Sequence, residues 1–145
     1  MRRMNVSVVM IKPDAVQRNL VEEIRKKLDQ HRLQIIERKT INADRRFIID
    51  LWPTVVNYEG RLERSLVYLT KAPLMIWLVK GTDAVKEAAE VKKEIRKGYC
   101  DDDFYTLLHC PDTEQDFLRE YKVLFPNEPL EMLLLKDENS SFFKR

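Results

Sequence analysis

Short runs of β-branched residues alternate along the chain with stretches in which apolar residues recur at helical spacing. Residues 6–11 are apolar apart from Ser7, and Pro13 closes the run, a pattern typical of a buried strand. The next apolar positions lie on one face of an amphipathic helix that ends near His31. They are Leu20, Val21, Ile24 and Leu28. Residues 33–42 return to an extended pattern and predict a second strand.

The pattern in the middle of the chain continues this alternation. Residues 47–51 and 62–69 predict a helical hairpin, and the almost wholly apolar residues 74–79 predict a central strand. Thr82, a residue type that caps helices well, precedes a run through Val91 whose outer face carries Lys and Glu. This stretch therefore predicts two short helices, a strand and a further helix.

The last apolar segments complete the fold class. Residues 106–110 form a short apolar stretch, and a final helix begins at Asp112 or Thr113. The inner face of that helix carries Phe117, Tyr121 and Leu124. The order β-α-β-α-β-α-β-α predicts an α+β fold, a ferredoxin-like sandwich whose flanking helices pack on one face of a four-stranded antiparallel sheet.

Length and charge limit the classes of protein that need be considered. A chain of 145 residues, 44% hydrophobic and 34% charged, fits one domain over residues 1–145. The net charge of +2 arises from 26 basic and 24 acidic side chains mixed along the whole length. Because no large basic field results, nucleic-acid binding is not expected.

The cysteines and the first residues bear on location. Cys100 and Cys110 are the only cysteines, so no disulfide framework is expected and a reducing cytoplasm is the natural compartment. Residues 1–3 are basic, but the apolar run after them is short and ends at the charged Lys12, unlike a signal peptide. No stretch approaches the roughly 20 apolar residues of a membrane span, so no membrane partner is expected.

A candidate phosphate-handling site combines Lys12-Pro13-Asp14, at the end of the first strand, with His109 far downstream. From position alone, a histidine where strand gives way to loop is more typical of a structural residue. However, residues 8–20 closely resemble the opening of nucleoside diphosphate kinases, where an apolar strand delivers a lysine to a nucleotide's phosphates. Residues 107–113 resemble the segment of that family that carries its nucleophilic histidine.

Two more residues occur at the spacing of that family. Arg96 lies 13 residues before His109 (109 minus 96), and Glu120 lies 11 residues after it (120 minus 109). The resemblance implies a nucleoside diphosphate kinase, which transfers the γ-phosphate of a nucleoside triphosphate to a nucleoside diphosphate. It also implies ping-pong kinetics through a phosphohistidine and Mg²⁺ that is bound with the nucleotide.

The resemblance assigns a role to each of these residues. His109 is the nucleophile and Glu120 orients its ring. Lys12 and Arg96 bring positive charge to the phosphates, and Thr106 contacts the sugar together with Lys12. Because two nearby cations disfavour protonation, the imidazole is expected to be neutral and reactive near neutral pH.

The acidic residues and the second histidine receive structural roles. Asp14 is expected to fix the loop after the first strand, and Asp112 to serve as a turn or cap residue. The three consecutive acids at residues 101–103 are interpreted as a solvated loop, so no metal site on the protein is expected. His31 is interpreted as a surface residue.

The chain departs from the family before His109. The family has an arginine at the position of Ala89, followed by a long loop with a phosphate-contacting threonine, and that loop is missing here. We hypothesise that Lys92 or Lys93 replaces the arginine. Because the family's loop also packs between dimers, a hexamer is not assumed. A homo-oligomer of at least two chains, paired through the exposed edge of the second strand, is expected.

Other departures lie in the nucleotide contacts. Thr106 stands where the family has an asparagine, and Pro111 where it has a serine. The family's base-stacking position falls near Arg61 or Leu62. The aromatic residues that could stack on the base instead are Trp52, Tyr58 and Tyr105.

Two other classes of protein compete with the kinase. The departures at Ala89 and Pro111 suit a nucleotide-binding or scaffold protein that kept the fold and lost turnover. An RNA-binding module would share the sandwich, but it requires aromatic residues on its central strands, and residues 6–11 contain none.

Overall fold

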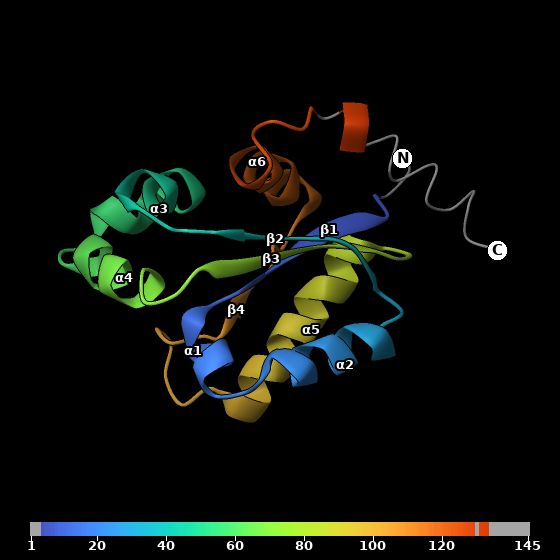
Figure 1. Ribbon diagram of the computed structural model, residues 1–145, viewed down its shortest axis with the longest axis horizontal. Helices are drawn as coiled ribbons and strands as arrows, with labels where there is room; N and C mark the ends of the chain where they lie inside the picture. The colour runs from blue at the N-terminus through green and yellow to red at the C-terminus, as the bar shows by residue number, and fades with distance from the viewer. Residues whose placement is uncertain (1–3, 130, 134–145) are drawn as a thin grey trace.

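Four strands form an antiparallel sheet in the order β2-β3-β1-β4 (Figure 1). The structure, a computed structural model, describes residues 4–129 and 131–133, so residues 1–3, considered above as a leader, lie outside it. The strands are β1 (Val6–Ile11), β2 (Gln34–Ile41), β3 (Leu74–Lys80) and β4 (Leu108–His109). The predicted four-stranded antiparallel sheet is therefore confirmed.

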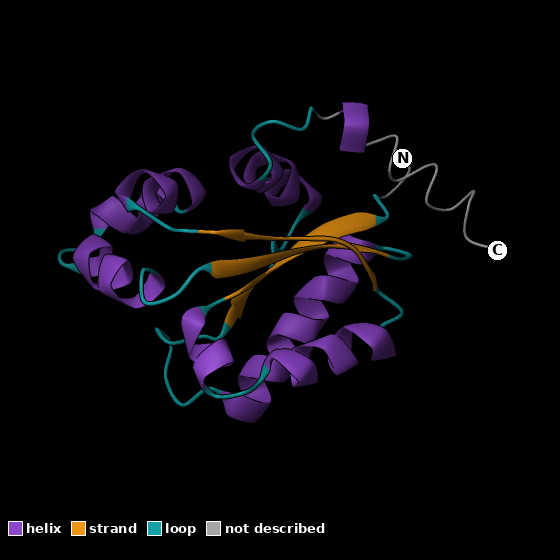
Figure 2. Ribbon diagram, viewed as in Figure 1, coloured by secondary structure: helices purple, strands orange, loops and turns teal. Residues whose placement is uncertain are grey.

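The helices follow the predicted order with two additions (Figure 2). They are α1 (Pro13–Gln17), α2 (Val21–Gln30), α3 (Arg45–Leu51), the 3₁₀ helix η1 (Pro53–Asn57), α4 (Arg61–Leu69), α5 (Ala84–Tyr99) and α6 (Glu114–Leu124). The sequence pattern did not predict α1, which begins at Pro13, where the absence of a proline N–H costs nothing. It also did not predict η1. In the part of the chain that the structure describes, no helix has the length and apolar character needed to cross a bilayer.

Two helix caps test the sequence predictions. Thr113 is the N-cap of α6, and its hydroxyl accepts a hydrogen bond from the backbone N–H of Asp116 at 3.0 Å. Thr113 is one of the two residues, with Asp112, at which the sequence predicted the start of this helix. The prediction of Thr82 as the cap of α5 is wrong, because Asp83 occupies the N-cap in a left-handed conformation with φ of 54°. The helix α5 also continues past Val91 to Tyr99, which places Arg96 on its last turn.

Helices cover both faces of the sheet, so the prediction of helices on one face is wrong (Figure 1). On one side, Val8 and Met10 of β1 pack in a core formed with α3, α4 and α6. On the other side, Val9 and Ile11 pack against α1, α2 and α5. The physical reason is visible in β1 itself, where all six residues are buried, because a strand covered on both faces is apolar throughout rather than alternating.

His31, predicted as a surface residue, is half-buried and joins the two helices below the sheet. Its Nδ1 lies 2.8 Å from a Glu87 carboxylate oxygen, and its Nε2 lies 2.7 Å from one of Glu94. Its side chain is 18% exposed. Burial acts to lower the pKa of His31, but the hydrogen bonds and charges of both glutamates outweigh burial and raise it. The protonated ring therefore links α2 to α5.

We predict that His31→Gln destabilises the protein mainly in acid. Because the pKa of His31 is raised in the folded protein, its protonated ring stabilises the fold fully at a pH below the unfolded pKa of about 6.5. This stabilisation is lost as the pH rises through the folded pKa. The expected loss is about 1 kcal/mol at pH 5.5 and near zero at pH 9, measured as urea midpoints at both values. Equal destabilisation at the two pH values would contradict the linkage.

Candidate functional site

His109 lies at the end of the edge strand β4, where it is held by residues from α6 and from the α3 region. Its partner in the sheet is Met10 of β1. The ring Nε2 lies 2.7 Å from Oε1 of Glu120, whose side chain is only 4% exposed, while that of His109 is 16% exposed. The ring of Trp52 packs edge-on at 5.4 Å between centroids. The histidine and glutamate predicted from spacing are therefore in direct contact.

The pKa of His109 lies below its usual value, and burial is the largest cause. The hydrogen bond and charge of Glu120 act in the opposite direction, whereas the charges of Lys12 and Lys92 lower the pKa further. From the sequence, the His109 ring is expected to be neutral because of two nearby cations, Lys12 and Arg96. In the structure desolvation dominates, because a charged imidazole is costly in a site with little water.

Arg96 reaches the segment before His109 through backbone carbonyls. Its guanidinium donates to the carbonyl oxygen of Thr106 at 3.2 Å and to that of Leu108 at 2.7 Å. The two bonds fix the strand that ends at His109. The structure thus brings Arg96 to the site and engages its guanidinium with the backbone.

Lys12 is the N-cap residue of α1 and is buried, with 8% of its surface exposed. Its Nζ donates to the hydroxyl of Thr106 at 3.0 Å and lies 5.5 Å from the centroid of the Trp52 ring. Burial, and next the charge of Arg96, lower the pKa of Lys12 to about 7, although Asp14 opposes this. Lys12 is therefore poised between its charged and neutral forms near neutral pH.

Asp14 ties three distant segments together. Its carboxylate accepts hydrogen bonds from the Tyr68 hydroxyl at 2.6 Å and from the Leu107 backbone N–H at 3.1 Å. Leu107 has a φ of 71°, a left-handed conformation that costs a branched residue energy unless its surroundings hold it. The backbone N–H of Lys12 also donates to the Leu107 carbonyl at 2.9 Å. Asp14 was predicted to fix the loop after the first strand, but the side-chain bonds given above hold the segment that leads into His109 instead.

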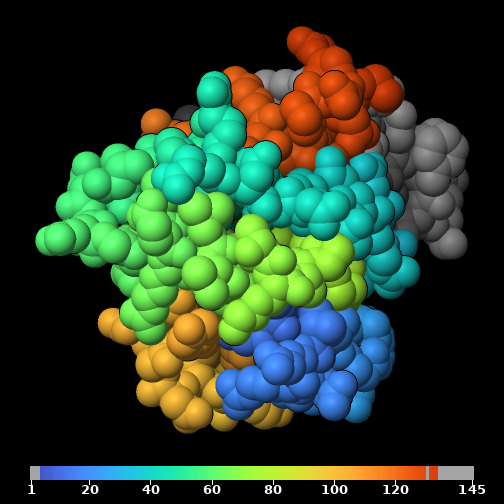
Figure 3. Space-filling model, turned by 60° about the vertical axis from the view of Figure 1, so that its left-hand side comes forward, coloured from blue at the N-terminus to red at the C-terminus, as the bar shows by residue number. Residues whose placement is uncertain are grey.

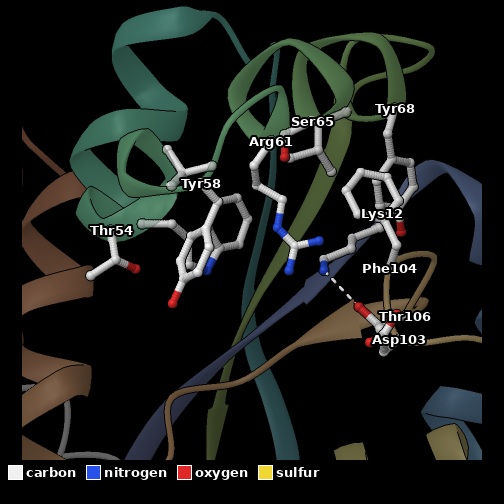
Figure 4. Close-up of a pocket in the computed structure, with 12 residues that line it drawn as sticks. Lys12, Thr54, Tyr58, Arg61, Ser65, Tyr68, Asp103, Phe104 and Thr106 are labelled. Carbon is white, nitrogen blue, oxygen red and sulfur yellow. Dashed lines mark hydrogen bonds between the residues drawn. The ribbon is translucent and has the colours of Figure 1, made fainter.

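A cavity of about 240 Å³ lies beside Lys12, between the helices η1 and α4 and the segment that connects α5 to β4. In the space-filling view this connecting segment, in orange, lies against the green helices (Figure 3). Three charged side chains line the cavity, namely Lys12, Arg61 and Asp103, together with the hydroxyl of Thr106 (Figure 4). Trp52 lines it as well and also contacts His109, so its ring joins the cavity to the histidine.

The aromatic residues differ in their access to this cavity. Trp52 and Tyr58, two of the three predicted base-stacking candidates, line it, whereas Tyr105 packs outside it against Tyr68 and Phe104. Sequence reasoning missed Tyr68 and Phe104, which also line the cavity. The pattern of residues 62–69 predicted a helix, but no local signal placed Tyr68 beside Lys12.

The structure does not support Lys92 or Lys93 as a phosphate contact. Lys92 is buried and donates to the Cys110 carbonyl at 2.9 Å and to the Asp112 carboxylate at 2.7 Å. Lys93 is exposed and lies 3.7 Å from Glu90. Lys92 instead fixes the turn that follows His109, and Asp112 is a residue of that turn, as predicted.

The acidic run at residues 101–103 forms a turn. One carboxylate oxygen of Asp102 accepts hydrogen bonds from the backbone N–H groups of Phe104 at 2.9 Å and Tyr105 at 2.8 Å. These bonds lower the pKa of Asp102. Within residues 4–129 and 131–133, no three side chains among His, Cys, Asp and Glu are grouped so that they could hold a metal ion.

Comparisons with known proteins agree on one family. The family model described as nucleoside diphosphate kinase matches residues 5–130. The nucleoside diphosphate kinase of Sulfurisphaera tokodaii is 30% identical, over 84% of this chain and 89% of its own. That of Pyrococcus furiosus is 27% identical, over 90% and 88%.

Among solved structures, the nucleoside diphosphate kinase of Aquifex aeolicus is similar with a TM-score of 0.72 and 18% identity. The match covers 88% of this chain and 98% of that one. At this identity the likeness shows the fold alone, and it agrees with the predicted ferredoxin-like class.

Proposed function

Because the chain belongs to the nucleoside diphosphate kinase family, we propose that it moves the γ-phosphoryl group of a nucleoside triphosphate to a nucleoside diphosphate through a phosphohistidine at His109. The kinetics are ping-pong, because one nucleotide leaves before the other reacts. The observation that carries the proposal is the contact between the Nε2 of a desolvated His109 and the buried carboxylate of Glu120.

This contact supports a proposal for the reacting nitrogen. A carboxylate can only accept hydrogen bonds, so the Nε2 that faces Glu120 carries the ring proton and Nδ1 keeps its lone pair. Nδ1 attacks the γ-phosphorus, the bond from that phosphorus to the β–γ bridging oxygen breaks, and the diphosphate leaves with the electron pair. A terminal oxygen of the acceptor diphosphate then attacks the phosphohistidine, and Nδ1 recovers its lone pair.

Lys12 and Thr106 stabilise the nucleotide in this proposal. Phosphoryl transfer spreads charge over the equatorial oxygens, so a cation fixed beside them lowers the barrier. The bound polyphosphate raises the pKa of Lys12 and keeps its ammonium charged. The Thr106 hydroxyl, already 3.0 Å from the Lys12 Nζ, contacts the sugar together with Lys12. Phosphate contact by Arg96 stays a prediction, since its guanidinium is bonded to two carbonyls.

Mg²⁺ fits the residues of the cavity as an ion that enters on the nucleotide. A hard cation takes oxygen ligands and needs few from the protein when phosphates supply most of them. The cavity wall offers the carboxylate of Asp103, which would contact such an ion, and the Thr106 hydroxyl. When bound, the ion neutralises charge on the phosphate oxygens.

Three further expectations belong to the proposal. The chain acts as one domain over residues 1–145, most of which the family model matches. It works in the cytoplasm, consistent with the free thiols of Cys100 and Cys110. It pairs with a second copy through β2, which lies at one end of the described strand order. Light scattering after size-exclusion chromatography tests the pairing.

Labelling with nucleotide tests the proposed reaction. The protein is incubated with γ-labelled ATP and Mg²⁺, assayed for acid-labile label on the chain, and then chased with GDP. The proposal expects label on the protein that moves to GTP. A protein that binds ADP but acquires no label would instead be the nucleotide-binding or scaffold member of the family.

We predict that Glu120→Gln lowers kcat by about 10- to 100-fold with little change in KM. Glutamine keeps the size of the side chain but loses the charge that favours the Nε2–H tautomer. Because the Glu120 charge raises the pKa of His109, its removal also lowers that pKa. The acid limb of the kcat/KM profile should therefore move to lower pH. A smaller kcat with an unmoved acid limb would contradict this electrostatic role.

A further inference from the structure

We propose that Arg61 is a phosphate ligand of this site, and that its guanidinium binds the polyphosphate of the nucleotide together with Lys12. The inference deepens the proposed function and rests on it, because it names the residue that supplies the missing positive charge. Neither the motif residues nor their spacing pointed to Arg61, which the sequence placed only near the family's base-stacking position.

The cations around His109 do not suffice for a polyphosphate. The pKa of Lys12 is about 7, mainly because of burial, so the free site holds only part of a charge there near neutral pH. Lys92 donates to the Cys110 carbonyl and the Asp112 carboxylate. Arg96 donates to two backbone carbonyls. Each would have to give up existing bonds to serve as a phosphate ligand.

Arg61 is a cation of the cavity wall whose guanidinium keeps its donors available. Among the residues that the structure describes, no carboxylate forms an ion pair with this guanidinium. Its contact is with the ring of Phe104, 5.4 Å from the centroid. Figure 4 shows the guanidinium extending from α4 towards the ammonium group of Lys12. An oxyanion between the two side chains would be bound from both sides.

The local backbone explains why Arg61 reaches this position. Gly60 adopts a left-handed conformation with φ of 76°, which glycine does without strain, and the chain turns there from η1 into α4. The backbone N–H of Arg61 donates to the Tyr58 carbonyl at 3.1 Å. Arg61 is therefore the first residue of α4 and stands at the wall of the cavity.

The chemistry of arginine favours phosphate as the ligand. A guanidinium stays charged at all relevant pH values and offers planar paired donors that match two phosphate oxygens. Asp103 is the carboxylate in the same cavity wall, and it would offer an oxygen ligand to Mg²⁺ bound with the phosphates. The ligand class is thus a nucleoside di- or triphosphate, recognised through its phosphates.

The test compares two probes on four proteins. ADP and inorganic tripolyphosphate, which has no base or sugar, are titrated by calorimetry into the wild type, Arg61→Ala, Arg61→Lys and Arg64→Ala. Arg64 is a matched control, because it is exposed on the same helix and contacts the Phe104 ring at 3.8 Å but does not line the cavity. Circular dichroism melting establishes that each variant is folded.

Arg61→Ala should lower the affinity for both probes about 10-fold, and Arg61→Lys should recover part of that affinity. Arg64→Ala should bind both probes as tightly as the wild type does. If Arg61→Ala bound ADP more weakly but bound tripolyphosphate as the wild type does, Arg61 would stack on the base. That result would overturn the inference. Equal losses in Arg61→Ala and Arg64→Ala would also overturn it, because a general surface charge would then explain the binding.

Binding without turnover separates this inference from the proposed reaction. If the wild type binds ADP but acquires no phosphohistidine, the transfer proposal fails and the Arg61 result still stands. If the wild type binds neither probe, the nucleotide site and the Arg61 inference fail together.

Discussion

Replacing His109 with glutamine should abolish phosphoryl transfer while leaving the nucleotide site intact. Glutamine can still donate an N–H to Glu120 across the 2.7 Å contact, so the local packing is retained. It offers no nucleophilic nitrogen, so the expected fall in the transfer rate is at least about 10³-fold, with no acid-labile label on the chain. ADP binding should persist, because His109 does not line the cavity.

The matched control for this variant is Glu120→Gln, which keeps the nucleophile and should still acquire label, only more slowly. Label and transfer that survive in His109→Gln would show that another side chain carries the phosphoryl group. Loss of ADP binding together with transfer would instead indicate that the histidine supports the fold of the site rather than its chemistry.

Replacing Lys12 with methionine should lower activity and raise stability at the same time. The ammonium is the cation nearest the proposed phosphates, and its removal should reduce kcat/KM by about 10²- to 10³-fold. Methionine fills a similar volume without a charge to desolvate. Because burial lowers the pKa of Lys12 to about 7, the folded protein bears the cost of that charge at neutral pH.

The size of the stability change depends on pH. The unfolded pKa of a lysine is about 10.4, and the pKa of Lys12 in the folded protein is lower. At a pH below the folded pKa, the charged lysine therefore destabilises the native state. This cost decreases as the pH rises from the folded pKa to the unfolded pKa. Lys12→Met should therefore be more stable than the wild type by roughly 2 kcal/mol at pH 6 to 7, and the gain should shrink by pH 10. Urea midpoints at these pH values measure it.

The pH profile of the wild type tests whether the charge of Lys12 is needed for activity. Its kcat/KM should fall as pH rises above about 7, when Lys12 of the free enzyme loses its proton, and the variant should lack this alkaline limb. If Lys12→Met were less stable than the wild type at neutral pH, Lys12 would stabilise the fold. That result would contradict the destabilisation that its lowered pKa implies.

The order of strands and helices followed from local patterns, and it was largely right because each pattern reports which face of an element is buried. Residues 6–11 and 74–79 became β1 and β3, and of the two predicted starts of the last helix, Asp112 and Thr113, Thr113 is its N-cap. The error about the sheet could have been avoided from the sequence, since residues 6–11 are apolar apart from Ser7, and a strand without alternating polar positions is typically covered on both faces. The Thr82 cap failed because Asp83 took the left-handed cap position.

The sequence named residues that the structure brings together, but it missed part of the cavity wall and the electrostatics of the site. Resemblance and spacing named Lys12, Arg96 and His109, which the structure brings together from the N-cap of α1, from α5 and from β4. The hydrogen bonds of Arg96 to backbone carbonyls could not be foreseen, because they depend on how the last turn of α5 packs against the chain before β4. The pairing of His31 with two glutamates was not foreseen for the same reason, since both glutamates lie on another helix.

The sequence alone determined the class of fold, the family resemblance and the residue types available for phosphate chemistry, because periodicity and motifs are local properties of the chain. Only the tertiary structure decided which of those residues are charged, which are already bonded and which face the cavity. Burial sets the pKa of Lys12 and His109, and Arg61 meets Lys12 at one cavity. Both facts depend on segments that are remote in sequence and adjacent only in the folded molecule.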